Sequence, residues 1–150
     1  MTTATEPIVP VLSSNVAGPL GVKHLPRLWL KLVLHSLGRL PEGYRHGHGG
    51  FDEFVTTTLG IDTEAFIAYV ESERPHYLAC EAWVREHAAS LTPETVATIN
   101  ARIEGADLPD TMLPDRRARL GPLVPEEIRR AYALNELDDW LAMHEALTGR

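Results

Sequence analysis

The sequence contains one cysteine, Cys80, so it cannot form an internal disulfide. Folds held together by disulfides are excluded, and a reducing, cytoplasmic location is the default expectation. Long hydrophobic runs are missing as well, because Lys31 interrupts the most apolar stretch, residues 28–34. A membrane helix needs roughly 20 predominantly apolar residues, so no membrane interaction is expected. The first 14 residues carry no basic group before an apolar segment, and no signal peptide is predicted.

The chain also lacks an excess of positive charge. Its formal net charge is -7, with 14 basic residues against 21 acidic ones. Domains that bind nucleic acids are usually basic, so a nucleic-acid partner is not expected. Residues 1–50 nevertheless hold five basic and two acidic side chains, whereas residues 51–150 hold nine and 19. This asymmetry is compatible with a local basic site for a small anion, and equally with charge complementarity inside the fold.

Signatures of common cofactor and metal sites are missing too. There is no phosphate-binding loop, no dinucleotide-binding fingerprint, no Gly-x-Ser-x-Gly elbow and no complete His-Glu-x-x-His motif. A single cysteine excludes a zinc site rich in thiolates. Redox chemistry would require a cofactor site, so we predict a protein that works without a cofactor.

Apolar residues follow a helical period over most of the chain, which predicts a mainly α-helical fold. We expect an extended N-terminal arm over residues 1–22 and a compact, single-domain bundle of about six or seven helices over residues 23–150. The predicted helices cover residues 26–37, 51–59, 62–73, 76–89, 92–105, 126–134 and 136–147. Asn135 is the expected cap between the last two. A long proline-rich loop at 105–125 holds a short helical turn at 115–120, and residues 7–12 form at most a short strand.

The densest group of reactive side chains lies in residues 43–52, which we call the Gly/His loop. Its sequence is Gly-Tyr-Arg-His-Gly-His-Gly-Gly-Phe-Asp. Glycine allows sharp turns and a close approach of the backbone to a ligand. Histidine exchanges a proton or binds a metal near neutral pH. The mixture predicts a functional site, and the alternative is a structural turn in which Asp52 only caps the next helix.

A row of cationic side chains precedes this loop. Its members stand four residues apart along the first predicted helix: Lys23, Arg27, Lys31, His35 and Arg39. Residues at this spacing lie on nearly the same face of a helix, where like charges repel each other. A bound anion or a facing acidic surface would offset that repulsion. The simpler alternative is the solvated face of an amphipathic helix.

Together these features predict a small cofactor-independent enzyme that uses acid–base chemistry on an anionic or carbonyl-bearing metabolite, of the lyase, isomerase or cyclase type. The residues expected to bind the substrate are Arg27, Lys31, His35 and Arg45. The residues expected to take part in catalysis are His46, His48, Asp52 and Tyr44. One loop histidine would act as general acid or base, oriented by the aspartate. The tyrosine hydroxyl would stabilise a developing oxyanion.

Two other classes of function remain open. The first is a non-catalytic domain that binds a small anion, or docks a protein partner through its cationic row. The second is a metal protein in which His46 and His48, two residues apart in an extended segment, point the same way and hold a divalent ion. Asp52 or His24 would be the third ligand. A homo-oligomer is compatible with each of these functions.

The remaining polar groups have simpler interpretations. A second basic cluster in the proline-rich loop either closes over an anionic ligand or is solvated; it consists of Arg116, Arg117 and Arg119. One of Asp138 and Asp139 is expected to pair with a basic residue of the first helix, while Trp140 packs. Cys80 is expected to be a buried thiol, and His24 stands too isolated to be given a role of its own.

Four segments together resemble a known family. They are Leu25-Pro26-Arg27-Leu28 with Lys31, then Gly43-Tyr44, then Leu59-Gly60-Ile61-Asp62 with Phe66, and finally Leu134-Asn135-Glu136-Leu137-Asp138-Asp139-Trp140. The chain is similar over most of residues 19–148 to the small bacterial family catalogued as domain of unknown function 5069. The resemblance implies a compact bacterial domain with no assigned reaction. It places Arg27, Lys31, Tyr44 and Asp139 on matching positions, whereas residues 46–50 are richer in histidine than the family pattern.

Overall fold

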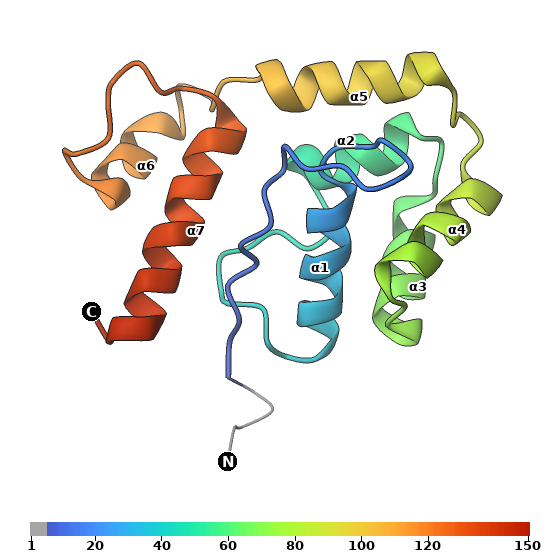
Figure 1. Cartoon of the computed structure of the whole chain (residues 1–150), viewed down its shortest axis with the longest axis horizontal. Coiled ribbons are helices and arrows are strands. Elements are labelled where there is room, and N and C mark those ends of the chain that lie inside the picture. The colour runs from blue at the N-terminus through green and yellow to red at the C-terminus, as the bar shows by residue number, and fades with distance from the viewer. Residues whose placement is uncertain (1–5) are drawn as a thin grey trace.

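A computed structural model describes residues 6–150, and the first five residues of the predicted arm lie outside that range. The chain folds into α1 (Leu25–Ser36), α2 (Gly50–Thr58), α3 (Thr63–Glu73), α4 (Tyr77–His87), α5 (Pro93–Gly105), α6 (Leu113–Leu120) and α7 (Ala131–Thr148). The predicted mainly α-helical, single-domain bundle is confirmed (Figure 1). The first five helices begin and end within two residues of their predicted bounds.

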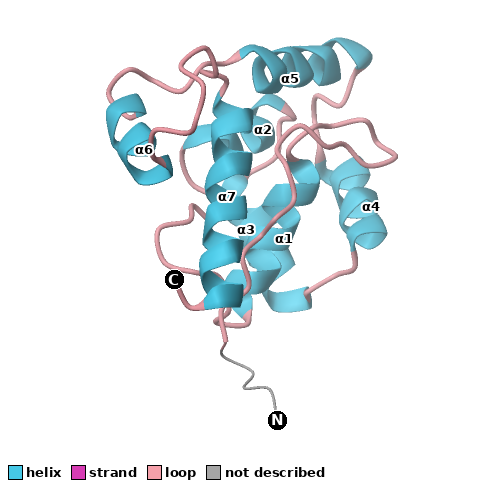
Figure 2. Cartoon of the chain, turned by 60° about the vertical axis from the view of Figure 1, so that its left-hand side comes forward, coloured by secondary structure: helices cyan, strands magenta, loops and turns pink. Residues whose placement is uncertain are grey.

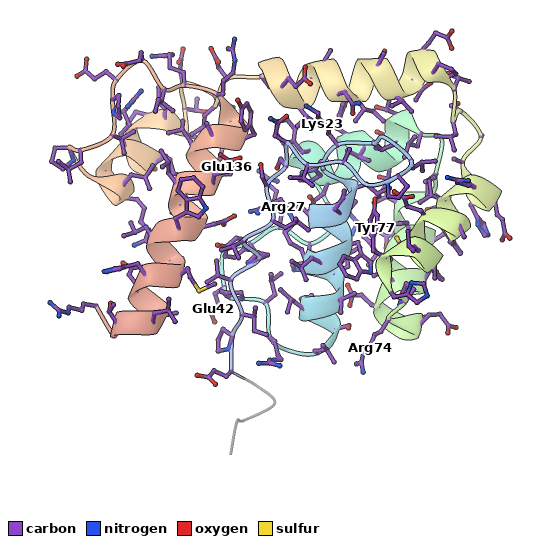
Figure 3. The ribbon with its side chains drawn as sticks, in the orientation of Figure 1. Lys23, Arg27, Glu42, Arg74, Tyr77 and Glu136 are labelled. Atoms are coloured by element: carbon purple, nitrogen blue, oxygen red, sulfur yellow. The ribbon has the colours of Figure 1, made fainter. Side chains whose placement is uncertain are left out.

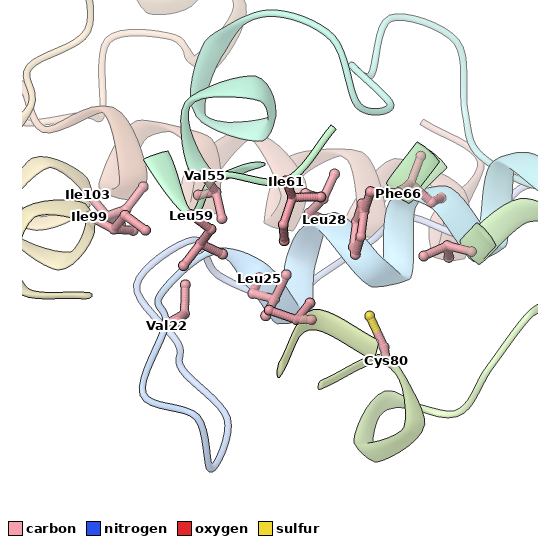
Figure 4. Packing of buried hydrophobic residues seen from close by; sticks show 13 residues of the cluster. Val22, Leu25, Leu28, Val55, Leu59, Ile61, Phe66, Cys80, Ile99 and Ile103 are labelled. Carbon is pink, nitrogen blue, oxygen red and sulfur yellow. The ribbon is translucent and has the colours of Figure 1, made fainter. Parts of the chain in front are cut away.

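Helix α1 lies at the centre of the bundle because its apolar side chains recur at helical spacing and face its neighbours. Leu25, Leu28 and Leu32 are fully buried, and they share one core cluster with side chains of α2 to α5 (Figure 4). Phe66 of α3 and Ile103 of α5 belong to the same cluster. A side chain of this size stabilises the fold by about 1.5–3 kcal/mol when it is fully buried, so α1 contributes strongly to the packing of α2 to α5.

Two helix starts follow the expected capping chemistry. The Asp62 carboxylate accepts hydrogen bonds from the backbone N–H groups of Glu64 at 3.0 Å and Ala65 at 3.3 Å, which begins α3. The Thr92 hydroxyl accepts one from Thr95 N–H at 3.1 Å at the start of α5. These bonds satisfy backbone donors that a helix leaves free at its N-terminus.

The C-terminal region departs from the prediction. Residues 126–134 and 136–147 do not form two helices; α7 is a single helix of 18 residues that runs through Asn135. The Asn135 side chain accepts a hydrogen bond from Arg116 of α6 at 2.8 Å instead of capping a helix. The segment before α7 is held by backbone bonds from Leu108 to Arg129 and from Ala131 to Ala106. The preference of asparagine for helix ends is thus overridden by tertiary hydrogen bonds.

The N-terminal arm passes between α1 and α7 (Figures 1 and 2). The short strand suggested for residues 7–12 is not formed; in the described part of the chain, bridge pairing is limited to two isolated residue pairs elsewhere. The Pro10 and Leu12 carbonyls of the arm instead accept hydrogen bonds from the guanidinium of Arg27. These two backbone carbonyls are therefore satisfied by a side chain of α1 and not by the backbone of a neighbouring strand.

Figure 1 shows α5 crossing the top of the molecule, from the α3–α4 side to the side of α6 and α7. A second, smaller apolar cluster joins α6 to α7 through Leu113, Ala131 and Leu134.

Trp140 is 57% exposed on α7, so the expectation that it packs is wrong. None of the helices in residues 6–150 combines the length and the apolar composition that crossing a membrane would take.

Candidate functional site

A cavity of about 700 Å³ opens between α1, the Gly/His loop, α6 and α7. Its lining includes six basic side chains, which are Arg27, Lys31, Arg45, Arg102, Arg116 and Arg119. Five acidic side chains also line it, which are Glu42, Asp52, Asp107, Asp138 and Asp139. In a chain whose net charge is -7, the cavity wall is a region where basic groups outnumber acidic ones.

The first polar network in the cavity wall is centred on Asp52. This residue lies in the first turn of α2 and is almost fully buried. Lys31 Nζ donates to Oδ1 at 2.8 Å and to Oδ2 at 2.9 Å, and the backbone N–H of Gly47 donates to Oδ2 at 2.9 Å. His24 Nε2 lies 2.6 Å from Oδ1. Burial alone would raise the pKa of Asp52, but the His24 hydrogen bond and the Lys31 charge hold it well below its usual range.

Asp52 therefore does more than cap a helix. The position before α2 is held by Gly49, whereas the Asp52 carboxylate is shared by α1, the Gly/His loop and α2. It does not orient a loop histidine either, because the imidazole that reaches it belongs to His24. The loop contributes only its backbone N–H at Gly47 to this carboxylate.

His24, for which the sequence suggested only a place as a third metal ligand, belongs to this network. It stands immediately before α1 with φ 73, a left-handed conformation that is unusual for a residue with a side chain. Burial lowers the pKa of His24 despite the hydrogen bond to Asp52, so the ring is neutral at pH 7. The neutral ring donates from Nε2 to Asp52 and accepts at Nδ1 from the Ser14 hydroxyl at 2.9 Å. Both ring nitrogens are thus engaged.

A second network joins the arm, α1, the Gly/His loop and α7. Its central residue is Arg27, which Figure 3 labels on α1. Arg27 Nη1 donates to Asp139 Oδ2 at 2.6 Å, which confirms the predicted pairing of an α7 aspartate with the first helix. The Tyr44 hydroxyl donates to Asp139 Oδ1 at 2.8 Å. Burial and the nearby Asp139 charge raise the pKa of Tyr44, so its hydroxyl remains a donor over the whole physiological range.

The two networks change the expected roles of the cationic row. Arg27 and Lys31, which were expected to bind a substrate, line the cavity, but each is paired with a buried carboxylate. Arg45 is exposed at the cavity and makes no ion pair with any residue of the range 6–150, while Arg102 stacks on Phe54 with 4.7 Å between guanidinium carbon and ring centroid. Arg45 and Arg102 are therefore available to a ligand, and so is Arg116, whose hydrogen-bond partner is the uncharged Asn135 side chain.

The loop histidines lie outside the cavity. The His46 ring stacks on that of His35, with 3.8 Å between centroids and 11° between planes. His48 Nε2 lies 3.0 Å from Glu64 and His48 Nδ1 lies 3.7 Å from Glu53. The structure does not bring His46, His48 or His35 to Asp52. The two loop histidines also face different partners, rather than forming one metal site together.

The chain turns at Gly47, which explains this arrangement. Its φ is +112, and a Cβ at this position would overlap the side chain of Ile67 on α3. Only glycine fits there, so the buried backbone rather than a side chain approaches Asp52. The flanking His46 and His48 are directed to the protein surface as a consequence.

The remaining candidates from the sequence are the second basic cluster and Cys80. Of the second basic cluster, Arg116 and Arg119 line the cavity, whereas Arg117 donates to the Glu126 and Ile128 carbonyls and holds the loop before α7. Cys80 is buried in the core as predicted. Burial raises the pKa of its thiol to about 12, which keeps it unreactive at neutral pH.

No protein-family model, curated protein or solved structure matches the chain. Membership of the family catalogued as domain of unknown function 5069 therefore stays a prediction. The four residues assigned to that family's pattern are Arg27, Lys31, Tyr44 and Asp139, and all of them line the one cavity described above.

Proposed function

We propose that the protein binds a small organic anion in the cavity between α1 and α7. The observation that carries the proposal is the pair of buried ionic networks, Arg27–Asp139 and Lys31–Asp52, in the wall of this cavity. Moving an ion into a protein interior costs several kcal/mol, and apolar residues often replace a buried ion pair without loss of stability. Two such pairs facing one cavity are therefore better explained by ligand binding than by stability.

The lining indicates the chemistry of the ligand. A volume of about 700 Å³ suits a metabolite-sized molecule. Apolar side chains contribute to the wall as well, among them Phe51, Leu108 and Met112. The free guanidinium groups of Arg45 and Arg102 match a carboxylate or phosphate group, which they can bind through paired hydrogen bonds. We expect a ligand with an anionic end and an apolar body.

Calorimetric titration with benzoate and with phenyl phosphate tests this proposal. We expect binding that weakens as salt rises past roughly 0.1 M, because exposed charges are then screened. Arg45→Gln and Arg102→Gln should each reduce the affinity by about tenfold. Arg85→Gln on α4 is the matched control, since this arginine is exposed and lies outside the cavity. Equal affinities in all three variants, or no binding of either probe, would refute the proposal.

The second candidate function is an acid–base enzyme of the lyase, isomerase or cyclase type, and the position of Lys31 favours it. The ammonium group uses two hydrogen bonds on Asp52 and lies in the cavity wall, so one N–H remains for a bound molecule. Burial lowers the pKa of Lys31, which makes it a better proton donor than an exposed lysine. Lys31 in its amine form would take the carbon-bound proton and return it as the ammonium, and Asp52 would position it. The Tyr44 hydroxyl, which donates to Asp139 in the absence of a ligand, would turn to donate to an oxyanion.

Proton NMR in D₂O separates the two candidates. A cofactor-independent acid–base catalyst should accelerate deuterium exchange beside the carbonyl of a bound 2-oxo acid such as pyruvate, and Lys31→Arg should slow that exchange. Tyr44→Phe should slow it as well while leaving the fold intact. Binding without any exchange above the rate in buffer would eliminate the enzyme and leave the binding protein.

A further inference from the structure

We propose that His35, His46 and Glu71 form a surface site for a divalent transition metal such as Zn²⁺. Among residues 6–150 this is the one group of three His, Cys, Asp or Glu side chains whose ligand atoms converge, all within 4.8 Å of one another. Two imidazoles and one carboxylate are a common ligand set for zinc, with water in the fourth position. The site lies outside the α1–α7 cavity and does not depend on the function proposed for it.

Three different segments supply the ligands. His35 is in the last turn of α1, Glu71 is on α3, and His46 is in the Gly/His loop. His35 Nδ1 lies 3.1 Å from both carboxylate oxygens of Glu71. The His46 ring lies against the His35 ring, with 3.8 Å between their centroids. Helix packing therefore holds two ligands together, and the loop adds the third.

The backbone beside His46 is fixed by two contacts. The neighbouring Gly47 is buried against Ile67 of α3, where a Cβ would not fit. Its N–H is hydrogen-bonded to the buried Asp52 carboxylate at 2.9 Å. The main chain that carries His46 is thus held against the helix that carries Glu71. This placement reduces the entropy lost when the three ligands close around an ion.

Binding requires one change in the side chains. A metal lies in the plane of each imidazole that binds it, and rings only 11° from parallel do not share such a point. One ring must therefore turn, and His46 is exposed and free to do so. Zn–N bonds measure about 2.0–2.1 Å. We expect zinc to separate the stacked pair, which would shift the ring-proton NMR signals of both histidines.

Titration of untagged protein with ZnCl₂ tests the site. The wild type should bind one equivalent, and His46→Asn, His35→Asn and Glu71→Gln should each weaken binding by more than about tenfold, since each removes a ligand. His48→Asn is the matched control. It changes a histidine of the same loop whose partners are Glu53 and Glu64, and it should leave zinc affinity unchanged.

Thermal melting without zinc shows whether each variant folds. Because His35 and His46 are exposed and Glu71 is only partly buried, we expect melting temperatures close to that of the wild type. No zinc binding by the wild type would overturn the proposal. Equal losses in His48→Asn and His46→Asn would overturn it as well, because zinc would then bind the loop without the predicted ligand set.

Discussion

The cationic row differs between the two halves of α1, although its spacing in the sequence is the same; α1 carries Arg27, Lys31 and His35, whereas Lys23 and Arg39 lie outside the helix. Arg27 and Lys31 are each 5% exposed and bind the carboxylates of Asp139 and Asp52. His35 has a side chain that is 42% exposed, one turn further along, and it meets Glu71 at the surface. The N-terminal half of α1 thus directs Arg27 and Lys31 toward α7 and α2, and its C-terminal half directs His35 toward solvent.

This difference shows that burial rather than residue type decides what a charge does. A buried ion whose partner is removed is left without water or counter-charge, whereas an exposed ion is solvated. The same helix face therefore has a rigid half, in the cavity wall, and an adaptable half, at the proposed metal site. The predictions below test how far the two halves differ.

The largest effect is expected when the buried network loses its carboxylate. Asp52→Ala leaves the buried Lys31 ammonium without its partner and should lower the free energy of unfolding by about 3–5 kcal/mol. Equilibrium unfolding in urea measures the loss. Glu53→Ala changes the neighbouring exposed carboxylate and loses its hydrogen bond from the Gly49 N–H, so it should cost at most about 1 kcal/mol. Similar losses in the two variants would contradict the proposed difference between buried and exposed charges.

A smaller loss is expected where the buried network meets the exposed loop. Gly47→Ala introduces a Cβ that overlaps Ile67 and forces a side chain into a left-handed conformation. It should lower the free energy of unfolding by roughly 2–4 kcal/mol. Gly43→Ala is the control, because Gly43 also has a positive φ, 92, but has open space around it. Its cost should be limited to about 1 kcal/mol, and an equal cost would show that Gly47 is not packed as described.

The buried network also predicts how stability depends on pH. The pKa of His24 is lower in the folded state than its ordinary value, so below about pH 6.5 the unfolded chain takes up a proton that the folded chain resists. Stability should therefore fall on acidification from pH 7 to pH 5, by at most about 1.4 kcal/mol per pH unit from this residue.

The variant His24→Asn isolates this contribution. Asparagine tolerates the left-handed conformation at position 24 and does not titrate. Urea unfolding at several pH values should give a flatter profile for the variant than for the wild type. An unchanged slope between pH 7 and pH 5 would show that another group causes the acid sensitivity.

The smallest effect is expected at the exposed end of the row. His35→Asn removes the surface interaction with Glu71 and the stacking with His46, and in the absence of zinc it should cost less than about 1 kcal/mol. The same urea unfolding experiment measures it. A loss as large as that of Asp52→Ala would mean that the two halves of the row are equally important to the fold.

Much of the secondary structure was predictable because it depends on local chemistry. The Asp62 carboxylate caps α3 with its neighbours in sequence, and the apolar period of α1 identifies its buried face. Prediction was wrong at Asn135, where a hydrogen bond from Arg116 of another helix holds the residue inside α7. Such a bond joins residues 19 positions apart, so no local pattern indicates it.

The candidate site was predicted in part. Arg27, Lys31, Tyr44, Arg45 and Asp52 were selected from the sequence, and all five line the cavity. Ser14 was missed, and His24 was considered only as a third metal ligand, because the His24–Asp52 contact spans 28 positions and neither residue belongs to a motif. The direction of a loop side chain depends on the residue against which the neighbouring glycine packs. That residue lies on another helix, so the loop sequence alone does not reveal it.

The sequence by itself determined the helical class, the position of most helices and the residue types gathered around the cavity, because these follow from periodicity, capping and composition. Only the tertiary structure decided which cations are buried and paired, and which histidine reaches Asp52. Those outcomes depend on the electrostatic cost of burial and on packing between segments distant in the chain. They placed His24 in the cavity wall and directed His46 toward His35 and Glu71 at the surface.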